Sequence, residues 1–247
     1  MNGERRMAFF TAVNIDGANW VHIIRKTGQP KAEATEKWYE DPRIDPLSQS
    51  DQSLYSSQEP FRVFDRGHLV RRQDPAWGTN EGAIRANADT FHFANCVPQQ
   101  KGFNQKTRYW QGIEKYVLDN AKAERMRINV FTGPVFAEDD PDYRYVKVPR
   151  MFWKIIIRVD NGDLLATAFL ADQSSLITRL PERLSEGFDD LSKVDEYQTT
   201  VTEIEELTGL DFGELRDHDT FESDAEDISP KFQPKSYSEI KLANKKR

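Results

Sequence analysis

The stretch "RMFWKIIIRVDNGDLLATAFLAD", residues 150–172, has the clearest strand pattern in the chain. It contains two apolar runs, rich in β-branched side chains, on either side of Asn161 and Gly162. An Asn-Gly pair suits the positive φ angles of a type I′ turn, so the pattern predicts a hairpin of two long strands. Because both runs are apolar over most of their length, we expect these strands at the centre of a sheet.

Other segments predict further strands. The alternating runs "RMAFFTAVNI" and "NWVHIIRKT" predict two strands joined by a turn at Asp16 and Gly17. The segment "MRINVFTGPVF" predicts a buried strand that stops at its Gly-Pro pair. A short alternating core in "NADTFHFANCVPQ" predicts another strand, which ends at Pro98. His22 and His92 fall inside two of these strands, and we expect both to be structural residues.

Two segments have the pattern of helices. In the second of them, Thr200 and Glu203 form a capping box, and Gly209 suits the C-terminal end. In the first, apolar residues recur at steps of three and four, the mark of an amphipathic helix: Trp110, Ile113, Val117 and Ala121. Strands with segregated helices indicate an α+β fold with a central, mostly antiparallel sheet. We expect one domain over residues 1–215, and an acidic segment with a mobile basic tail over residues 216–247.

The composition limits the compartment and the partners. Cys96 is the only cysteine among 247 residues, so no intramolecular disulfide can form, which favours a reducing, cytoplasmic compartment. The apolar run near the N-terminus is too short for a signal sequence or a membrane span, and we expect no membrane partner. A net charge of −7 argues against a protein that coats nucleic acid.

The stretch "FRVFDRGHLVRRQDP", residues 61–75, concentrates positive charge in this acidic chain. Hydrolysis of a phosphodiester needs a base to activate water and positive charge to balance the phosphate. His68 among arginines offers both, because the arginines favour its neutral, proton-accepting form. Taken alone, the stretch fits an ordinary surface histidine better than a catalytic one.

A second group of polar residues lies in "NCVPQQKGFNQKTRYWQGIE", residues 95–114. The side-chain oxygens of Asn104 and Glu114 suit a hard cation such as Mg²⁺, which takes few protein ligands and keeps most of its waters. Each residue also has a simpler interpretation. Asn104 can be a helix N-cap, and Glu114 can be a solvated charge on a helix.

The combination of these stretches resembles a known family. The motif "DRGH" is followed by "N..PQ....N" and "W..IE", and then by "FTGPVF", "VPRMFWKIII", "ATAFLADQ" and "TTVTEIEELTGLDF". In this order, over residues 8–215, the segments resemble the DNA/RNA non-specific endonucleases, which are ββα-metal or His-Me finger enzymes. The resemblance implies an active site of that finger type, which hydrolyses DNA and RNA and leaves 5′-phosphate ends.

The resemblance also implies a role for each residue. His68 would be the general base, and Asn104 would bind Mg²⁺ directly, with Mn²⁺ as a substitute. Glu114 would orient a water on the metal, Arg66 would contact the phosphate, and Asn95 would support the site. The remaining phosphate contacts are expected from four arginines: Arg62, Arg71, Arg72 and Arg108.

Two features depart from the family pattern. Asn104 and Glu114 are ten residues apart instead of eight. On an unbroken helix, ten steps would place Glu114 about 80° from Asn104 in the direction opposite to eight steps, so we expect a wider loop over residues 106–108. Leu118 stands where the family has an arginine, and Arg71, Arg72 or Arg108 would replace it. The family has a further arginine upstream, in a segment similar to "EKWYEDPRI". In this chain, that segment has only Lys37 and Arg43 as candidates for its role.

The sequence thus predicts an Mg²⁺-dependent endonuclease for DNA and RNA without sequence preference. Two alternatives stay open: a catalytically silent relative that binds nucleic acid or a protein, and a phosphodiesterase for a small nucleotide. The resemblance implies a homodimer as one partnership. A nuclease inside a cell would also need an inhibitor or a regulatory domain.

Overall fold

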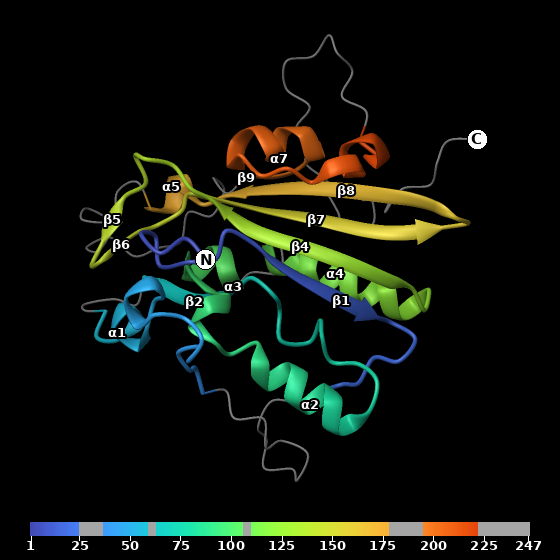
Figure 1. Ribbon diagram of the computed structural model, residues 1–247, viewed down its shortest axis with the longest axis horizontal. Coiled ribbons are helices and arrows are strands. Elements are labelled where there is room, and N and C mark those ends of the chain that lie inside the picture. The colour runs from blue at the N-terminus through green and yellow to red at the C-terminus, as the bar shows by residue number, and fades with distance from the viewer. Residues whose placement is uncertain (25–36, 59–62, 106–109, 178–194, 222–247) are drawn as a thin grey trace.

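A five-stranded antiparallel sheet forms the centre of the molecule (Figure 1). The computed structural model describes residues 1–24, 37–58, 63–105, 110–177 and 195–221. In spatial order, the strands of the sheet are β1 (Thr11–Asp16), β4 (Arg127–Val135), β7 (Met151–Asp160), β8 (Asp163–Asp172) and β9 (Asp195–Thr199). Strands combined with separate helices confirm the α+β class.

The predicted central hairpin is confirmed. Strands β7 and β8 pair along their whole length, from Met151 opposite Asp172 to Asp160 opposite Asp163. The turn residue Asn161 has φ 51° and the next residue, a glycine, has φ 91°, so both occupy the left-handed region that this turn requires.

The predicted N-terminal hairpin is wrong. Strand β1 pairs with β4, from Thr11 opposite Thr132 to Asp16 opposite Arg127, and residues 20–24 contain only an isolated bridge at Trp20. The Asp16 carboxylate accepts hydrogen bonds from the two backbone N–H groups that follow Gly17, which turns the chain away from the sheet. Alternation in a sequence identifies a strand but not its partner.

Strand β4 also continues past the predicted stop. Pro134 lies opposite Phe152 of β7 within the strand. On its other side β1 pairs only as far as Thr132, so the missing N–H of Pro134 interrupts no hydrogen bond to β1. At Gly133 a Cβ would lie 2.4 Å from the carbonyl oxygen of Phe9, so this position requires glycine.

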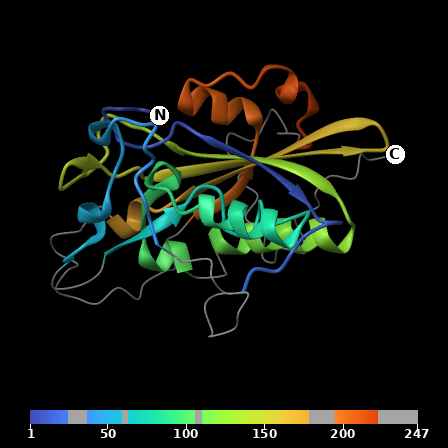
Figure 2. The ribbon, with the colours of Figure 1, turned by 60° about the horizontal axis from the view of Figure 1, so that its bottom comes forward.

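Helices cover both faces of the sheet (Figures 1 and 2). Helix α7 (Val201–Thr208) and the 3₁₀ helix η3 (Gly213–His218) pack on one face, where Trp153 and Ile155 are buried. Helix α4 (Trp110–Ala123) packs on the other face, beside Ile156. Both predicted helices are therefore present. The Thr200 hydroxyl accepts from Glu203 N as the capping box requires, and Gly209 ends α7 in the left-handed conformation.

A smaller layer beside the sheet carries a two-stranded ribbon. Its strands β2 (Phe64–His68) and β3 (Cys96–Gln100) pair antiparallel, with His68 opposite Cys96. The predicted alternating strand is thus limited to β3, which runs through Pro98, and His92 lies before it. The remaining elements are η1 (Pro46–Ser48), α1 (Gln52–Tyr55), α2 (Asn80–Asp89), η2 (Phe93–Asn95), α3 (Lys101–Gln105), β5 (Asp142–Tyr143), β6 (Val146–Lys147) and α5 (Ser174–Ile177).

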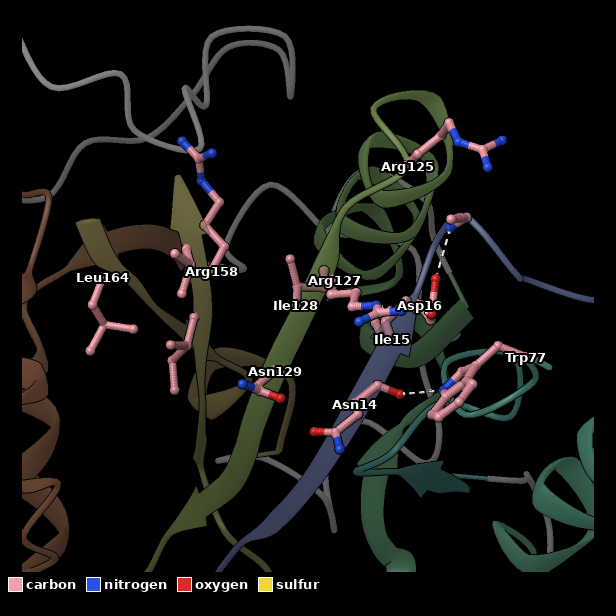
Figure 3. A pocket seen from close by; sticks show the side chains of 13 residues that line it. Asn14, Ile15, Asp16, Trp77, Arg125, Arg127, Ile128, Asn129, Arg158 and Leu164 are labelled. Atoms are coloured by element: carbon pink, nitrogen blue, oxygen red, sulfur yellow. Dashed lines mark hydrogen bonds and ion pairs between the residues drawn. The ribbon is translucent and has the colours of Figure 1, made fainter. Parts of the chain in front are cut away.

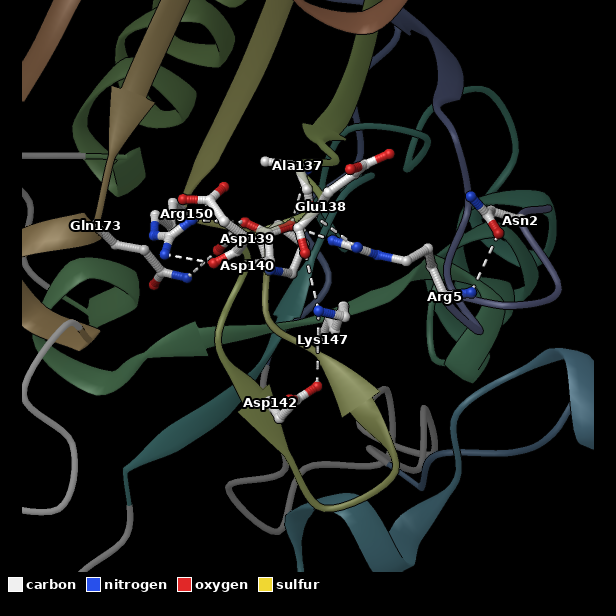
Figure 4. Close-up of polar contacts among 11 residues, drawn as sticks. Asn2, Arg5, Ala137, Glu138, Asp139, Asp140, Asp142, Lys147, Arg150 and Gln173 are labelled. Carbon is white, nitrogen blue, oxygen red and sulfur yellow. Dashed lines mark hydrogen bonds and ion pairs between the residues drawn. The ribbon is translucent and has the colours of Figure 1, made fainter.

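Buried polar contacts join this layer to the sheet. Gln173 Oε1 accepts from Gln100 N at 2.8 Å, and Gln173 Nε2 donates to Pro149 O at 2.8 Å. Nearby, the buried Asp140 forms ion pairs with Arg5 and Arg150 (Figure 4). These contacts hold the N-terminal segment and β3 against the end of the sheet.

The described chain continues beyond residue 215. Thr220 N donates to Ala166 O of β8 at 3.0 Å, and Asp219 forms an isolated bridge with Ala166. The predicted mobile tail lies, from residue 222 onward, outside the described residues.

Candidate active site

A cleft of about 860 Å³ brings the predicted site residues together. Strand β2 contributes His68, helix α3 contributes Asn104, and helix α4 contributes Glu114. Of the predicted phosphate contacts, Arg66, Arg71 and Arg72 line the cleft. Arg62 and Arg108 lie outside the described residues.

His68 lies at the end of β2, between aromatic rings. Its ring centroid is 4.6 Å from that of Trp38 and 5.0 Å from that of Phe91. The residue before it must be glycine, because a Cβ on Gly67 would lie 2.3 Å from the side chain of Gln99. These aromatic contacts hold the imidazole at the cleft wall.

Asn95 holds the chain that leaves His68. Its Oδ1 accepts from Val70 N at 2.8 Å, and its Nδ2 donates to Val70 O at 2.9 Å and to Thr90 O at 2.9 Å. Asn95 does not line the cleft. The amide therefore acts on the backbone next to His68 and not on the contents of the cleft.

The orientation of the Asn104 amide is fixed by a buried carboxylate. Asn104 Nδ2 donates to Asp65 Oδ2 at 3.0 Å, and Asp65 is only 3% exposed. Because the nitrogen is engaged, Oδ1 is the amide atom left to accept or coordinate. An amide oxygen is a suitable ligand for Mg²⁺ or Mn²⁺, so the donor at this position fits the expected metal.

The helix that carries Asn104 is itself capped by a side chain. Gln100 Oε1 accepts from Gly102 N at 2.5 Å and from Phe103 N at 3.1 Å, which satisfies two N–H groups at the start of α3. Asn104 is thus a residue within a short helix, and not the N-cap considered from the sequence.

Glu114 lies in the first part of α4, a helix separate from α3. Asn104 and Glu114 line the same cleft despite their spacing of ten residues. The predicted loop at residues 106–108 lies outside the described residues. Glu114 is not a solvated charge, because its side chain is 10% exposed and its Oε1 lies 3.5 Å from Nζ of the buried Lys154.

Positive charge lines the cleft beyond the predicted arginines. Two lysines of α4 that the sequence did not single out, Lys115 and Lys122, lie there and both pair with Asp119. Leu118 also lines the cleft, and so do Arg71 and Arg72, two of the three expected substitutes for the missing arginine.

The two upstream cations do not belong to this site. Arg43 pairs with Asp41 at 2.6 Å, and Lys37 Nζ lies 5.1 Å from the ring centroid of Tyr39. Neither lines the cleft. Both remain without a role in the chemistry that the cleft supports.

Several cleft residues were missed or misjudged from the sequence. His22 is exposed and lines the cleft, stacked on Trp20 with centroids 5.5 Å apart, so its expected place inside a strand is wrong. Trp38 gave no signal of its own. Lys154 could have been found from the sequence, because it is a charged residue in the middle of an apolar strand and such a residue must find a partner inside the protein.

A buried acid lies behind the cleft. Asp74 is 4% exposed, and burial raises the pKa of its carboxyl to about 7. The positive charges of Arg71 and Lys154 oppose this increase in pKa, while the negative charge of Glu114 adds to it. Charges of both signs are therefore close enough to interact beneath the cleft.

A second hollow of about 960 Å³ lies where β1 ends and β4 begins (Figure 3). Trp77 Nε1 donates to Asn14 O at 2.8 Å at its edge, and Arg127 pairs with Asp16 at 3.2 Å. Figure 3 shows Arg125 pointing outward, away from this pair. Of the predicted site residues within the described ranges, none lines this hollow.

The chain belongs to the DNA/RNA non-specific endonuclease family, whose model matches residues 1–218. It is 41% identical to the uncharacterized protein y4fB of Sinorhizobium fredii over 218 residues, which cover 86% of this chain and 32% of y4fB. It is 27% identical to a nuclease of Nostoc sp., with 65% of this chain and 53% of the nuclease covered.

A further similar protein is the human mitochondrial nuclease EXOG, 27% identical over 198 residues, which cover 71% of this chain and 46% of EXOG. The chain spans about a third to a half of the length of these curated relatives. Among the residues that the structure describes, no group of three or more His, Cys, Asp or Glu side chains could hold a metal ion. No helix in the described ranges is long and apolar enough to cross a membrane.

Proposed function

We propose that this chain is an Mg²⁺-dependent endonuclease that hydrolyses phosphodiester bonds of DNA and RNA without sequence preference. One observation carries the proposal. His68, Asn104 and Glu114 come from three different elements and line the same cleft, together with cationic side chains. Membership of the endonuclease family supports the same function.

His68 would accept the proton of the attacking water. Its ring lies among aromatic side chains at the cleft wall, where its orientation is restricted. General-base catalysis requires a base within hydrogen-bonding distance of the water, and this restriction keeps the imidazole in place. The products would be a 5′-phosphate and a 3′-hydroxyl.

Asn104 Oδ1 would hold the metal, and Glu114 would accept hydrogen bonds from water beside it. When bound, Mg²⁺ supplies positive charge that stabilises the phosphorane and the leaving oxygen. Arg66 would contact the phosphate: its guanidinium donates to Gln52 Oε1 at 2.7 Å and lies 5.7 Å from the ring centroid of Trp38, so both contacts orient it.

The charges of the cleft suit a polyanionic substrate. Among the described residues, its lining has five Lys and Arg side chains against three carboxylates, whereas the whole chain carries a net charge of −7. Positive charge concentrated in the cleft would attract the phosphate backbone and leave the acidic remainder unengaged. Contacts with phosphates carry no sequence information, so low specificity follows.

Two assays test the proposal. The purified chain is incubated with plasmid DNA and with RNA, in Mg²⁺ and in EDTA, and the product ends are identified by susceptibility to a 5′-phosphate-dependent exonuclease. We expect both polymers to be cut in the presence of Mg²⁺ and to stay intact in EDTA. Intact polymers with turnover of bis(p-nitrophenyl) phosphate would favour the small-nucleotide phosphodiesterase, and binding without any cleavage would favour the silent relative.

A further inference from the structure

Lys154 occupies a position where an apolar residue is expected. It lies in β7 between Phe152 and Ile156 on the face that α4 covers, and its neighbours across the sheet are Thr132 and Phe169. Its side chain is only 2% exposed. A buried ammonium group is costly unless a carboxylate compensates its charge.

That carboxylate belongs to the cleft. Lys154 Nζ lies 3.5 Å from Glu114 Oε1, a distance that is long for a strong hydrogen bond, so attraction between two buried charges dominates the contact. Glu114 lines the cleft and Lys154 does not. The lysine therefore contacts the glutamate from the side of the sheet, opposite the side on which substrate would bind.

Strand β7 and helix α4 are both held firmly by their packing, so the Lys154–Glu114 contact can fix the direction of the glutamate side chain. Lys154 is on a strand paired on both sides, and Glu114 is on a helix whose apolar residues Ile113 and Val117 are buried against the same sheet. Asp74 is a second buried acid: burial raises the pKa of its carboxyl, and the positive charge of Lys154 opposes that increase.

A role in stability alone does not account for the lysine. Replacing a buried ion pair by apolar residues of similar volume is often neutral or stabilising, because both charges must be stripped of water. An ion pair can however fix the direction of a carboxylate, and partners that orient groups around a metal typically change metal affinity or activity by about 10- to 100-fold when removed.

We propose that Lys154 is a positioning residue that holds the Glu114 carboxylate toward the cleft from beneath. This inference rests on the proposed function of Glu114. It adds a charged residue of the central sheet to the site and assigns it an action through Glu114, without contact to substrate or metal.

A double-mutant cycle tests the proposal. The variants Lys154→Met, Glu114→Gln and the double variant are compared for kcat, KM, Mn²⁺ affinity by calorimetry and thermal stability. Lys154→Met should lower kcat and Mn²⁺ affinity by about 10- to 100-fold with KM nearly unchanged. In the Glu114→Gln background the same change should lower neither by more than about threefold, because the residue through which Lys154 acts is already altered.

Stability is read separately in each variant. Lys154→Met leaves Glu114 buried without its counter-charge and should lower the melting temperature, whereas the double variant removes both charges and should recover it. Lys147→Met is the matched control, since this strand lysine pairs with Asp142 at 3.9 Å outside the cleft (Figure 4), and it should leave kcat unchanged.

Equal losses of kcat and Mn²⁺ affinity in both backgrounds would overturn the proposal, as would an unchanged Mn²⁺ affinity in Lys154→Met. The calorimetric cycle needs no turnover. A wild-type chain that binds Mn²⁺ but cuts neither DNA nor RNA would therefore contradict the proposed function, while the proposal for Lys154 would still be decided.

Discussion

Replacing Asp65 by leucine should weaken metal binding without unfolding the protein. The Asp65 carboxylate is the acceptor that fixes Asn104 Nδ2 at 3.0 Å and so directs Oδ1 as the coordinating atom. Leucine has a similar volume but accepts no hydrogen bond, so the Asn104 amide is free to rotate and present its NH₂ group instead. Loss of such a partner typically costs about 10- to 100-fold in metal affinity, or roughly 1.4 to 2.7 kcal/mol.

The assay is the rate of plasmid cleavage as a function of Mg²⁺ concentration, with Mn²⁺ affinity measured by calorimetry. We expect the half-saturating concentration of either ion to rise by about 10- to 100-fold, with kcat at saturating Mg²⁺ close to that of the wild type. Asp16→Leu is the control, because Asp16 is similarly buried (6% exposed) and hydrogen-bonded but lies outside the cleft. A folded Asp65→Leu variant with unchanged metal dependence would refute the reasoning.

Three further predictions concern the buried acid Asp74, the thiol of Cys96 and two arginines of the cleft. Burial raises the pKa of Asp74 from 3.8 to about 7, so its stabilising contribution is complete below pH 4 and is lost as the pH rises to 7. Asp74→Asn, which imitates the protonated acid, should match the wild type at pH 4 and exceed it by up to about 4 kcal/mol at pH 8, measured by urea unfolding in EDTA; a less stable variant at pH 8 would contradict this sign. Burial raises the pKa of the Cys96 thiol to about 12, so a disulfide reagent at pH 8 should react slowly with the native protein and rapidly in urea, and rapid native reaction would show that the site opens. In a His68→Ala background, Arg71→Ala and Arg72→Ala should each reduce the salt dependence of DNA binding, log K against log salt, by about 0.9 if that arginine contacts a phosphate, and an unchanged slope would exclude the contact.

Local patterns in the sequence were sufficient for the elements that depend on neighbouring residues. The Asn161–Gly162 turn and the Thr200 cap are both determined within a few positions, and both are present. The partner of β1 could not be found in this way, because Thr11 pairs with Thr132 across the chain and alternation alone favoured the adjacent segment.

The same difference between local patterns and long-range contacts applies to the candidate site. The resemblance of the ordered motifs to the endonuclease family predicted that His68, Asn104 and Glu114 belong together, and all three line one cleft. The contacts that orient them join residues 39 and 40 positions apart, Asn104 with Asp65 and Glu114 with Lys154, and only the folded chain brings these pairs together. The ordered motifs indicated candidate site residues, whereas the contacts around those residues depend on tertiary packing.

The most direct test of the central claim, that His68 is the base of a nuclease site, is chemical rescue of His68→Ala. Cleavage of plasmid and RNA in Mg²⁺ is measured with and without added imidazole, beside His92→Ala, in which the replaced histidine lies outside the cleft. We expect His68→Ala to lose at least about 100-fold in rate and to regain activity with imidazole, whereas His92→Ala should resemble the wild type. Cleavage by His68→Ala at the wild-type rate would contradict the claim.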